Sequence, residues 1–284
     1  MFSVHCTLNR IIYKIMTRLK RKSIFELLLI LCGSLILIFI LAPILGLTFS
    51  SSINQLIAAA KSSTVIQSIW LTIWVSMAGT LFFSIFAVPF AYFLARKNFV
   101  FKKIISGIID VPVVIPHSAA GIAILCVISR ETIIGRTANH LGLSFINHPL
   151  GIMVAMAFVS LPYLINAARD GFESIPRKYE KAAYTLGASH CRVFFTISIP
   201  LSWRSILSGF VMMWGRGLSE FGAIVIIAYH PMVTSVLIYN RFMAFGLKYV
   251  EPVAVLFIVV CIFLFVCLRL LSDSKRAYKR RSRY

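Results

Sequence analysis

Two side chains of opposite charge, Arg216 and Glu220, lie in an otherwise apolar segment of this sequence. A charge in the middle of a bilayer costs roughly 2.5–3.5 kcal/mol, so each of them needs a partner. Because the two residues are four positions apart, they share one helical face and neutralise each other. The pair either fixes the orientation of its helix or lines and gates a transport path. We favour the first role, since a neutralised arginine offers an anion little net attraction.

A second apolar segment contains two prolines four positions apart, Pro112 and Pro116, followed by small residues. Prolines interrupt the hydrogen bonding of a helix and kink it. Irregular backbone at membrane depth is tolerated where it faces protein or a water-filled cavity. The small residues fit either tight packing or a path wall, and His117 fits a hydrogen-bonded structural role better than a ligand role. Our candidate path-lining residues are Pro116, Ser118, Gly121 and Ser219.

A polar, basic stretch between two long apolar segments has the spacing of a short helix. Four of its residues fall at i, i+3, i+4 and i+7, which is one helical face. Two of the four residues are alanines, whose short side chains would let a partner protein approach the helix backbone closely. An interfacial helix without a partner has the same spacing. The four residues are Tyr179, Ala182, Ala183 and Leu186.

The ends of this helix are also predicted by residue type. Ser174 suits the N-cap and Pro176 the first turn. Gly187 suits the end, because glycine adopts the left-handed conformation there at little cost. Ser189 is expected to cap a second short helix, and Pro200 precedes the next apolar segment. The prediction is a helix–glycine–helix element near the membrane surface.

The sequence lacks the common motifs of catalysis. It contains no G-x-x-x-x-G-K-[ST] phosphate-binding loop, no H-E-x-x-H and no G-x-S-x-G. Its nine acidic residues are scattered, without the spacing of a metal site. We therefore predict no catalytic and no metal-binding residues, and expect any ATP-driven work to need a separate subunit.

Composition indicates the class of protein that carries these residues. The chain has 284 residues, of which 59% are hydrophobic and 13% charged, whereas soluble proteins are about 25% charged. The net charge of +20 resembles that of a nucleic-acid-binding protein. However, the basic residues lie at the chain ends and in short connections rather than along one face, which argues against nucleic acid. The composition favours membrane spans.

Six apolar segments are long enough to cross a bilayer, which takes about 20 residues. The first is longer than the apolar part of a signal peptide, so we expect an uncleaved anchor. The predicted spans are Leu27–Phe49, Val65–Leu94, Ile104–Ile128, Leu150–Ala168, Ile206–Tyr229 and Val253–Leu271. The predicted organisation is an all-α membrane protein with a basic segment at 1–26, a first helix at 27–49, a transmembrane domain at 65–271 that includes a loop at 173–200, and a basic tail at 272–284.

The basic residues in the connections predict the orientation in the membrane. With a cytoplasmic N-terminus, 23 Lys and Arg residues fall inside and five outside, and Arg216 lies within a span. This bias places both termini and the loop at 182–200 in the cytoplasm.

The basic loop also resembles a known signature. Lys181-Ala182-Ala183, Gly187 and Ile197-Ser198-Ile199-Pro200 are similar to E-A-A-x3-G-x9-I-x-L-P of the membrane subunits of binding-protein-dependent ABC importers. The resemblance implies the type I importer (ABC transmembrane type-1) fold, with this loop as the coupling helix that docks on an ATPase. Lys181 replaces the Glu of the signature, and Glu180 precedes it, so no salt bridge is carried over from that Glu. The implied ATPase-coupling residues are Tyr179, Lys181, Ala182, Ala183, Leu186, Gly187 and Pro200.

The segments around the charged pair carry a further resemblance. Ser219-Glu220-Phe221-Gly222-Ala223 and Leu237-Ile238-Tyr239-Asn240-Arg241-Phe242 are similar to the permeases for molybdate and tungstate, and sulfate permeases share a related form. The resemblance implies a permease subunit that translocates a small oxyanion. Tungstate or molybdate is the preferred substrate, and sulfate or another small solute is the alternative. An ion-coupled secondary transporter and a membrane-embedded enzyme are the alternatives of a different class.

The resemblance also implies the partners. They are a second permease copy in a homodimer, two ATPase subunits that use ATP and Mg, an extracytoplasmic oxyanion-binding protein and the lipid of the cell membrane. This chain itself is expected to bind no cofactor. Arg241 and Lys248, in the last outer loop, are our candidates for docking the binding protein.

Overall fold

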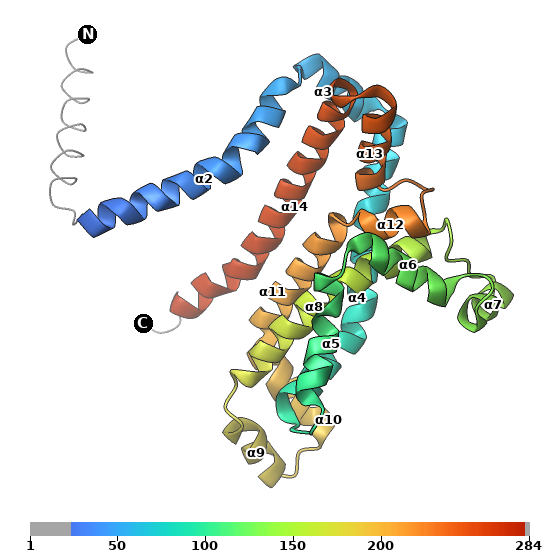
Figure 1. Cartoon of the computed structure of the whole chain (residues 1–284). Helices are drawn as coiled ribbons and strands as arrows, with labels where there is room; N and C mark the ends of the chain where they lie inside the picture. The colour runs from blue at the N-terminus through green and yellow to red at the C-terminus, as the bar shows by residue number, and fades with distance from the viewer. Residues whose placement is uncertain (1–23, 282–284) are drawn as a thin grey trace, which may run out of the picture. The chain divides into compact units, whose positions relative to one another are not determined.

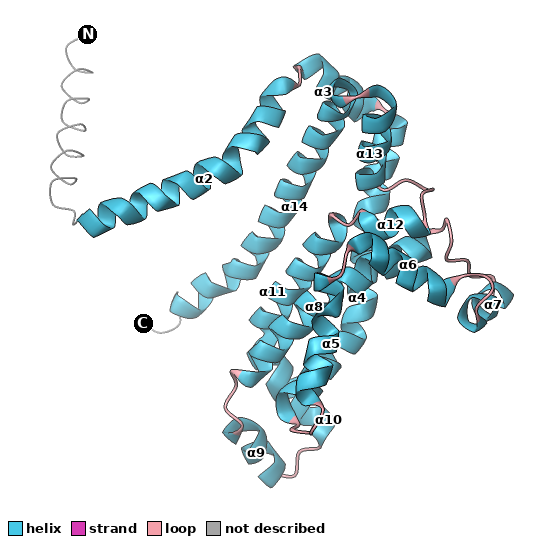
Figure 2. Cartoon of the chain, viewed as in Figure 1, coloured by secondary structure: helices cyan, strands magenta, loops and turns pink. Residues whose placement is uncertain are grey.

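The structure, a computed structural model, describes residues 24–281, and every regular element in this range is a helix (Figures 1 and 2). This confirms the all-α prediction. The chain divides into two units, Met1–Ser52 and Ile53–Tyr284. Most of the predicted segment at 1–26, and the side chains of the predicted tail at 272–284, lie outside the described residues.

The first unit contributes one long helix, α2 (Ile24–Ser50), which confirms the first predicted span. Its mean hydropathy is 3.0, and large apolar side chains are exposed around its whole surface. A helix that is apolar on all sides needs lipid or another protein around it. This composition is that of a membrane helix.

Five helices of the described residues are long and apolar enough to cross a membrane, or six if α5 and α6 form one interrupted span. Besides α2 they are α4 (Ser63–Arg96), α8 (Pro149–Glu173), the continuous stretch His190–Leu218, and Leu247–Leu268 within α14 (Leu247–Arg281). The second, fourth and sixth predicted spans are therefore helices, each extending beyond its predicted ends. Helix α14 also runs through most of the predicted tail.

The third predicted span, Ile104–Ile128, is not one kinked helix. It consists of α5 (Lys102–Val114) and α6 (His117–Ile128), whose axes differ by 113°. Between them Ile115 is extended, with φ −71° and ψ 148°, because a residue that precedes a proline avoids the helical region. Pro116 therefore separates two helices rather than kinking one, whereas Pro112 lies inside α5.

The fifth predicted span, Ile206–Tyr229, is wrong at both ends. The helical stretch begins at α10 (His190–Val193), passes a π-helical turn (Phe194–Ser198) and continues as α11 (Ile199–Leu218). The π-helical turn lets the chain pass Pro200, which has no N–H for the regular ladder. After α11 the chain breaks, and a separate short helix follows, α12 (Gly222–Ile227).

Short helices connect the long ones. They are α3 (Ile53–Lys61), α7 (Ile133–His140), α9 (Lys178–Thr185) and α13 (Thr234–Phe245). Of these, only α9 was predicted from the sequence.

Helices α4, α8 and α11 form the centre of the second unit (Figure 1). Glycine makes their close approach possible, because a Cβ on Gly209 of α11 would lie 2.8 Å from the Cβ of Ala167 on α8. Gly222 likewise presses α12 against the first residue of α6, where its Cβ would lie 2.7 Å from the Cβ of His117. Gly215 makes no such contact, because a Cβ there would have no atom within 4 Å.

Candidate functional site

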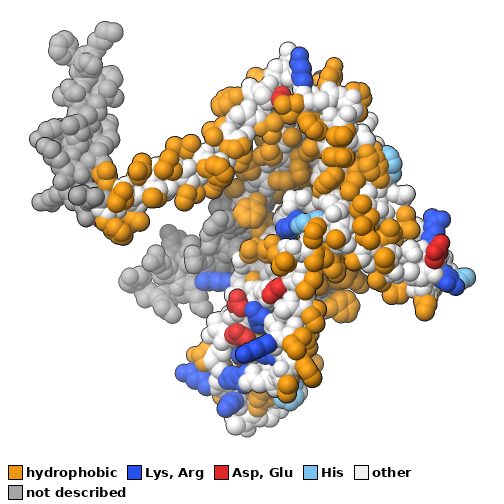
Figure 3. Space-filling view, in the orientation of Figure 1, with side chains coloured by type: hydrophobic (Ala, Val, Ile, Leu, Met, Phe, Trp, Pro, Cys, Tyr) orange, Lys and Arg blue, Asp and Glu red, His pale blue; other side chains and the backbone are white. Residues whose placement is uncertain are grey.

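Charged side chains gather at the end of the second unit that holds α9, whereas hydrophobic side chains cover most of the helices above it (Figure 3). This end contains the predicted coupling loop. The polar character of the loop therefore persists in the folded chain.

The predicted helix–glycine–helix element is present. Gly187 follows α9 with φ +81°, and the N–H groups of Gly187 and Ala188 donate to the carbonyls of Tyr184 and Ala183, both at 3.0 Å. This pair of bonds closes a helix on a left-handed residue. The Ser189 hydroxyl accepts from the N–H of Arg192 at 3.3 Å and caps α10, as predicted.

The predicted start of this element is wrong. Ser174 does not cap α9: it ends α8, where its N–H donates to the Asp170 carbonyl at 3.0 Å. The reason is that α8 continues past its predicted end at Ala168. Arg177 takes the N-cap position of α9 instead.

Most of the predicted docking face is open to its surroundings. Tyr179 is 48% exposed and Leu186 is 88% exposed, Ala182 and Lys181 are exposed, and Ala183 is half-buried. Pro200 is exposed at the beginning of α11. The predicted docking face therefore keeps apolar side chains exposed within a polar loop.

Glu180, which was not among the predicted coupling residues, holds this element in place. Its carboxylate accepts from Nε of Arg96 and from the Ser198 hydroxyl, at 2.9 and 2.8 Å. The side chains of Arg96 and Glu180 are only 9% and 7% exposed. Arg96 ends α4 and Ser198 precedes α11, so one carboxylate joins α9 to both central helices.

The bonds around Arg96 extend this connection. Its Nη2 donates to the Ile175 carbonyl at 3.4 Å, and Nη2 of Arg177 donates to the Arg96 carbonyl at 3.1 Å.

Burial, together with a hydrogen bond to Tyr92, raises the pKa of Tyr184 to about 12. Tyr184 therefore remains an uncharged phenol at physiological pH.

The second predicted feature, the charged pair, is part of a larger polar cluster. Nη2 of Arg216 lies 3.1 Å from Oε2 of Glu220, which confirms the pair. Nδ1 of His117 lies 2.7 Å from the same oxygen, and Nη2 of Arg216 lies 2.9 Å from both ring nitrogens of His117. His117 is thus hydrogen-bonded, as predicted. Glu220 lies beyond the end of α11 rather than on the same helix as Arg216.

The other predicted path-lining residues differ in exposure. Pro116, Ser118 and Ser219 are exposed close to this cluster. Gly121 is buried, because it packs against α12: a Cβ there would lie 2.9 Å from the Cα of Ala223. Gly121 thus belongs to the contact between α6 and α12.

The two candidate docking residues lie at the opposite end of the second unit from α9 (Figure 1). Arg241 of α13 and Lys248 of α14 line the same cavity of about 380 Å³. The structure therefore brings them together, although the sequence only placed them in one loop.

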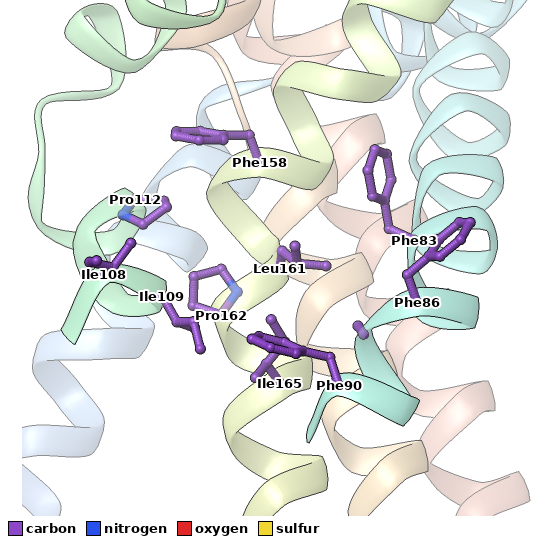
Figure 4. A pocket seen from close by; sticks show the side chains of 11 residues that line it. Phe83, Phe86, Phe90, Ile108, Ile109, Pro112, Phe158, Leu161, Pro162 and Ile165 are labelled. Carbon is purple, nitrogen blue, oxygen red and sulfur yellow. The ribbon is translucent and has the colours of Figure 1, made fainter. Parts of the chain in front are cut away.

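A cavity of about 300 Å³ lies between α4, α5 and α8 (Figure 4). Aromatic side chains such as Phe83 and Phe158 and the ring of Pro162 line it, and none of its lining side chains is polar. An oxyanion needs hydrogen-bond donors when it leaves water. The polar cluster, rather than this cavity, has the chemistry to meet an anion.

Comparison with known proteins connects these features to a family. Residues 87–277 match the family model "Binding-protein-dependent transport system inner membrane component". The chain is 39% identical over 247 residues to a molybdate/tungstate transport system permease protein of Thermococcus kodakarensis, covering 86% of this chain and 95% of that protein. It is 29% identical over 198 residues to a probable sulfate transport system permease protein of Chlorella vulgaris, covering 68% and 74%.

The fold has a solved counterpart. A chain of a bacterial ABC transporter involved in the import of the acidic polysaccharide alginate superposes with a TM-score of 0.71 at 18% identity, covering 92% of this chain and 98% of that one. The family match and the relative at 39% identity lead to one assignment. The chain belongs to the family of inner membrane components of binding-protein-dependent ABC transport systems, and it is a transport component rather than an enzyme.

Proposed function

We propose that this permease translocates molybdate or tungstate. The observation that carries the proposal is the 39% identity to a molybdate/tungstate permease over 95% of its length. Sulfate is the second candidate, because the chain is also similar to a probable sulfate permease. That identity is lower, 29%, and covers a shorter stretch of 198 residues. All three are tetrahedral dianions, so the same general path chemistry serves each of them.

We also propose the assembly and its orientation. Two copies of this chain form the path, two ATPase subunits bind the α9 loops and use ATP and Mg, and an extracytoplasmic protein delivers the oxyanion. The excess of 23 basic residues over five supports cytoplasmic termini and a cytoplasmic α9. The exposed apolar groups of α9, Tyr179 and Leu186, support docking of a protein there.

Glu180 gives this assembly a mechanical connection. When the ATPase moves α9, the buried bonds of Glu180 to Arg96 and Ser198 carry the displacement to α4 and to the beginning of α11. A buried ion pair resists separation, since breaking it leaves an uncompensated charge. The ATPase thus acts on the central helices through one carboxylate.

The substrate is tested by an uptake competition panel with the binding protein and the ATPase supplied. Labelled molybdate is taken up by proteoliposomes in the presence of unlabelled tungstate, molybdate, sulfate or phosphate. We expect tungstate and molybdate to compete at concentrations at least about tenfold below sulfate, since about 1.4 kcal/mol of discrimination gives that factor.

Two outcomes contradict the proposal. Stronger competition by sulfate would reassign the substrate. ATP-independent uptake by the permease without the ATPase would indicate a secondary transporter instead.

A further inference from the structure

Two interrupted helices meet at the polar cluster. The α5–α6 break ends at Pro116, and the α11–α12 break begins at Ser219. Gly222 holds the two breaks together by its close contact with His117. Irregular backbone at membrane depth is stable only where protein buries it or where it lines a water-filled cavity. Interrupted helices near the middle of the membrane are where transporters place substrate sites.

The cluster lies deep along its helix. Arg216 follows Arg204 by 12 residues within α11, which is about 18 Å of helix and more than half of the roughly 30 Å hydrocarbon core. Figure 3 shows basic and histidine atoms surrounded by hydrophobic surface in the region where α6, α11 and α12 meet. A charge exposed to lipid at this depth is costly. Its exposed side therefore faces a path or another protein.

The charges of the cluster are unequally exposed. Glu220 is 1% exposed, and its oxygens already accept bonds from the Ala223 N–H at 3.0 Å, from His117 and from Arg216. The side chains of Arg216 and His117 are 23% and 35% exposed, and Ser219 is exposed beside them. Although the pair is neutral as a whole, the surface presents the guanidinium and a hydroxyl, with the carboxylate behind them.

The hydrogen bonds leave donors available on this surface. Nη1 of Arg216 bonds to the Ser219 hydroxyl at a long 3.3 Å, and Nε has no acceptor among the described residues. His117 turns Nδ1 to Glu220, so its Nε2 accepts from Arg216 when the imidazole is neutral. The Ser219 hydroxyl donates its own proton to the Arg216 carbonyl at 3.1 Å. His117 and Glu220 thus position the guanidinium, and the free donors on this surface belong to Arg216, with the Ser219 hydroxyl beside them.

We propose that Arg216 and Ser219 form a transient binding site for the transported oxyanion, positioned by His117 and Glu220. This inference rests on the proposed oxyanion function. Conduction needs a site that attracts the ion and then releases it. The buried carboxylate of Glu220 supplies this balance, because it offsets part of the attraction between Arg216 and a dianion.

The test compares two substitutions of nearly equal size at the exposed Ser219. Ser219→Glu places a carboxylate against Arg216, where it occupies the donors and repels an oxyanion. Ser219→Gln adds the same bulk without charge. We expect the Gln variant to lose about threefold in molybdate uptake and the Glu variant at least about tenfold more, the effect of a charge-assisted hydrogen bond.

Both variants are assembled with the ATPase and assayed for ATP hydrolysis stimulated by the loaded binding protein. This assay shows whether each variant still assembles with the ATPase and the binding protein, so that a loss of uptake can be separated from a loss of assembly. Equal uptake by the two variants would overturn the site and leave a purely structural ion pair. If the wild type takes up none of the oxyanions, the proposed function fails instead.

A double substitution, Arg216→Gln with Glu220→Gln, tests the guanidinium itself. Removing both charges leaves no unpaired buried ion, so the fold is not penalised as it would be by a single change. We expect a loss of uptake of about tenfold or more with the ATPase still assembled. Wild-type uptake in the double variant would contradict the proposal.

Discussion

At the scale of single residues, two neighbouring charged side chains of α9 differ in burial. Lys181 occupies the position of the signature's Glu and is exposed, whereas Glu180 is buried against Arg96 and Ser198. Helical neighbours point about 100° apart, so a shift of one residue moves a side chain from the docking face to the protein interior. The acidic group of this loop therefore anchors α9 and is not part of its exposed face.

Gly187 provides the test at this scale. A Cβ there meets no atom within 4 Å, so only its φ of +81° opposes a side chain. A β-branched residue in that conformation costs roughly 1–3 kcal/mol. We expect Gly187→Val to turn α10 away from α9 and to reduce oxyanion uptake per ATP hydrolysed by about tenfold, as 1.4 kcal/mol would.

Gly187→Ala is the matched control, with the same free space and a smaller backbone penalty. Uptake and ATP hydrolysis are measured together in proteoliposomes. Coupling and assembly of the Val variant at wild-type levels would exclude a role for this turn.

At the scale of elements, the interruptions of the helices matter more than their lengths. Hydropathy shows where apolar residues are, but it does not show where the backbone leaves the helical ladder. Pro116 interrupts the third segment, whereas Pro200 is absorbed by a π-helical turn and interrupts nothing. The break after Leu218 occurs without a proline. There the Glu220 carboxylate binds the N–H of Ala223 and the Ser235 hydroxyl binds the Glu220 carbonyl.

The connection between α9 and α4 is tested by a double-substitution cycle. Arg96→Met leaves Glu180 buried without its counter-ion, which is expected to lower the free energy of unfolding by about 3–5 kcal/mol. Arg96→Met with Glu180→Met replaces both charges by apolar side chains and is expected to regain most of that loss.

Unfolding of the detergent-solubilised protein measures the stability of both variants. The double variant should still take up less oxyanion per ATP hydrolysed than the wild type, because Ser198 loses its bond to the Glu180 carboxylate and α9 loses its ion pair with α4. Equal stability of the single and double variants would show that the ion pair does not hold α9.

At the scale of the whole molecule, the second unit places two surfaces at opposite ends. One is the α9 loop, and the other is the basic cavity of Arg241 and Lys248 (Figure 1). These are the two surfaces at which we propose that the ATPase and the binding protein dock.

Charge reversal tests the second surface. Arg241→Glu with Lys248→Glu should raise the concentration of loaded binding protein that half-stimulates ATP hydrolysis by about tenfold, because an attraction becomes a repulsion. Salt serves as the control, since screening should weaken docking of the wild type and strengthen that of the variant. An unchanged concentration would exclude these residues from the docking surface.

The sequence by itself determined the all-α class, the apolar segments and the helix–glycine–helix element. Hydropathy and helical periodicity are local properties that need no partner from elsewhere in the chain. Only the tertiary structure decided that Glu180 pairs with Arg96, 84 residues away, and that His117 joins Glu220, 103 residues away. The same packing makes the predicted pair of Arg216 and Glu220 part of a cluster with a buried carboxylate and a partly exposed guanidinium. Which side of an ion pair faces outward depends on how distant helices pack, and no local pattern contains that information.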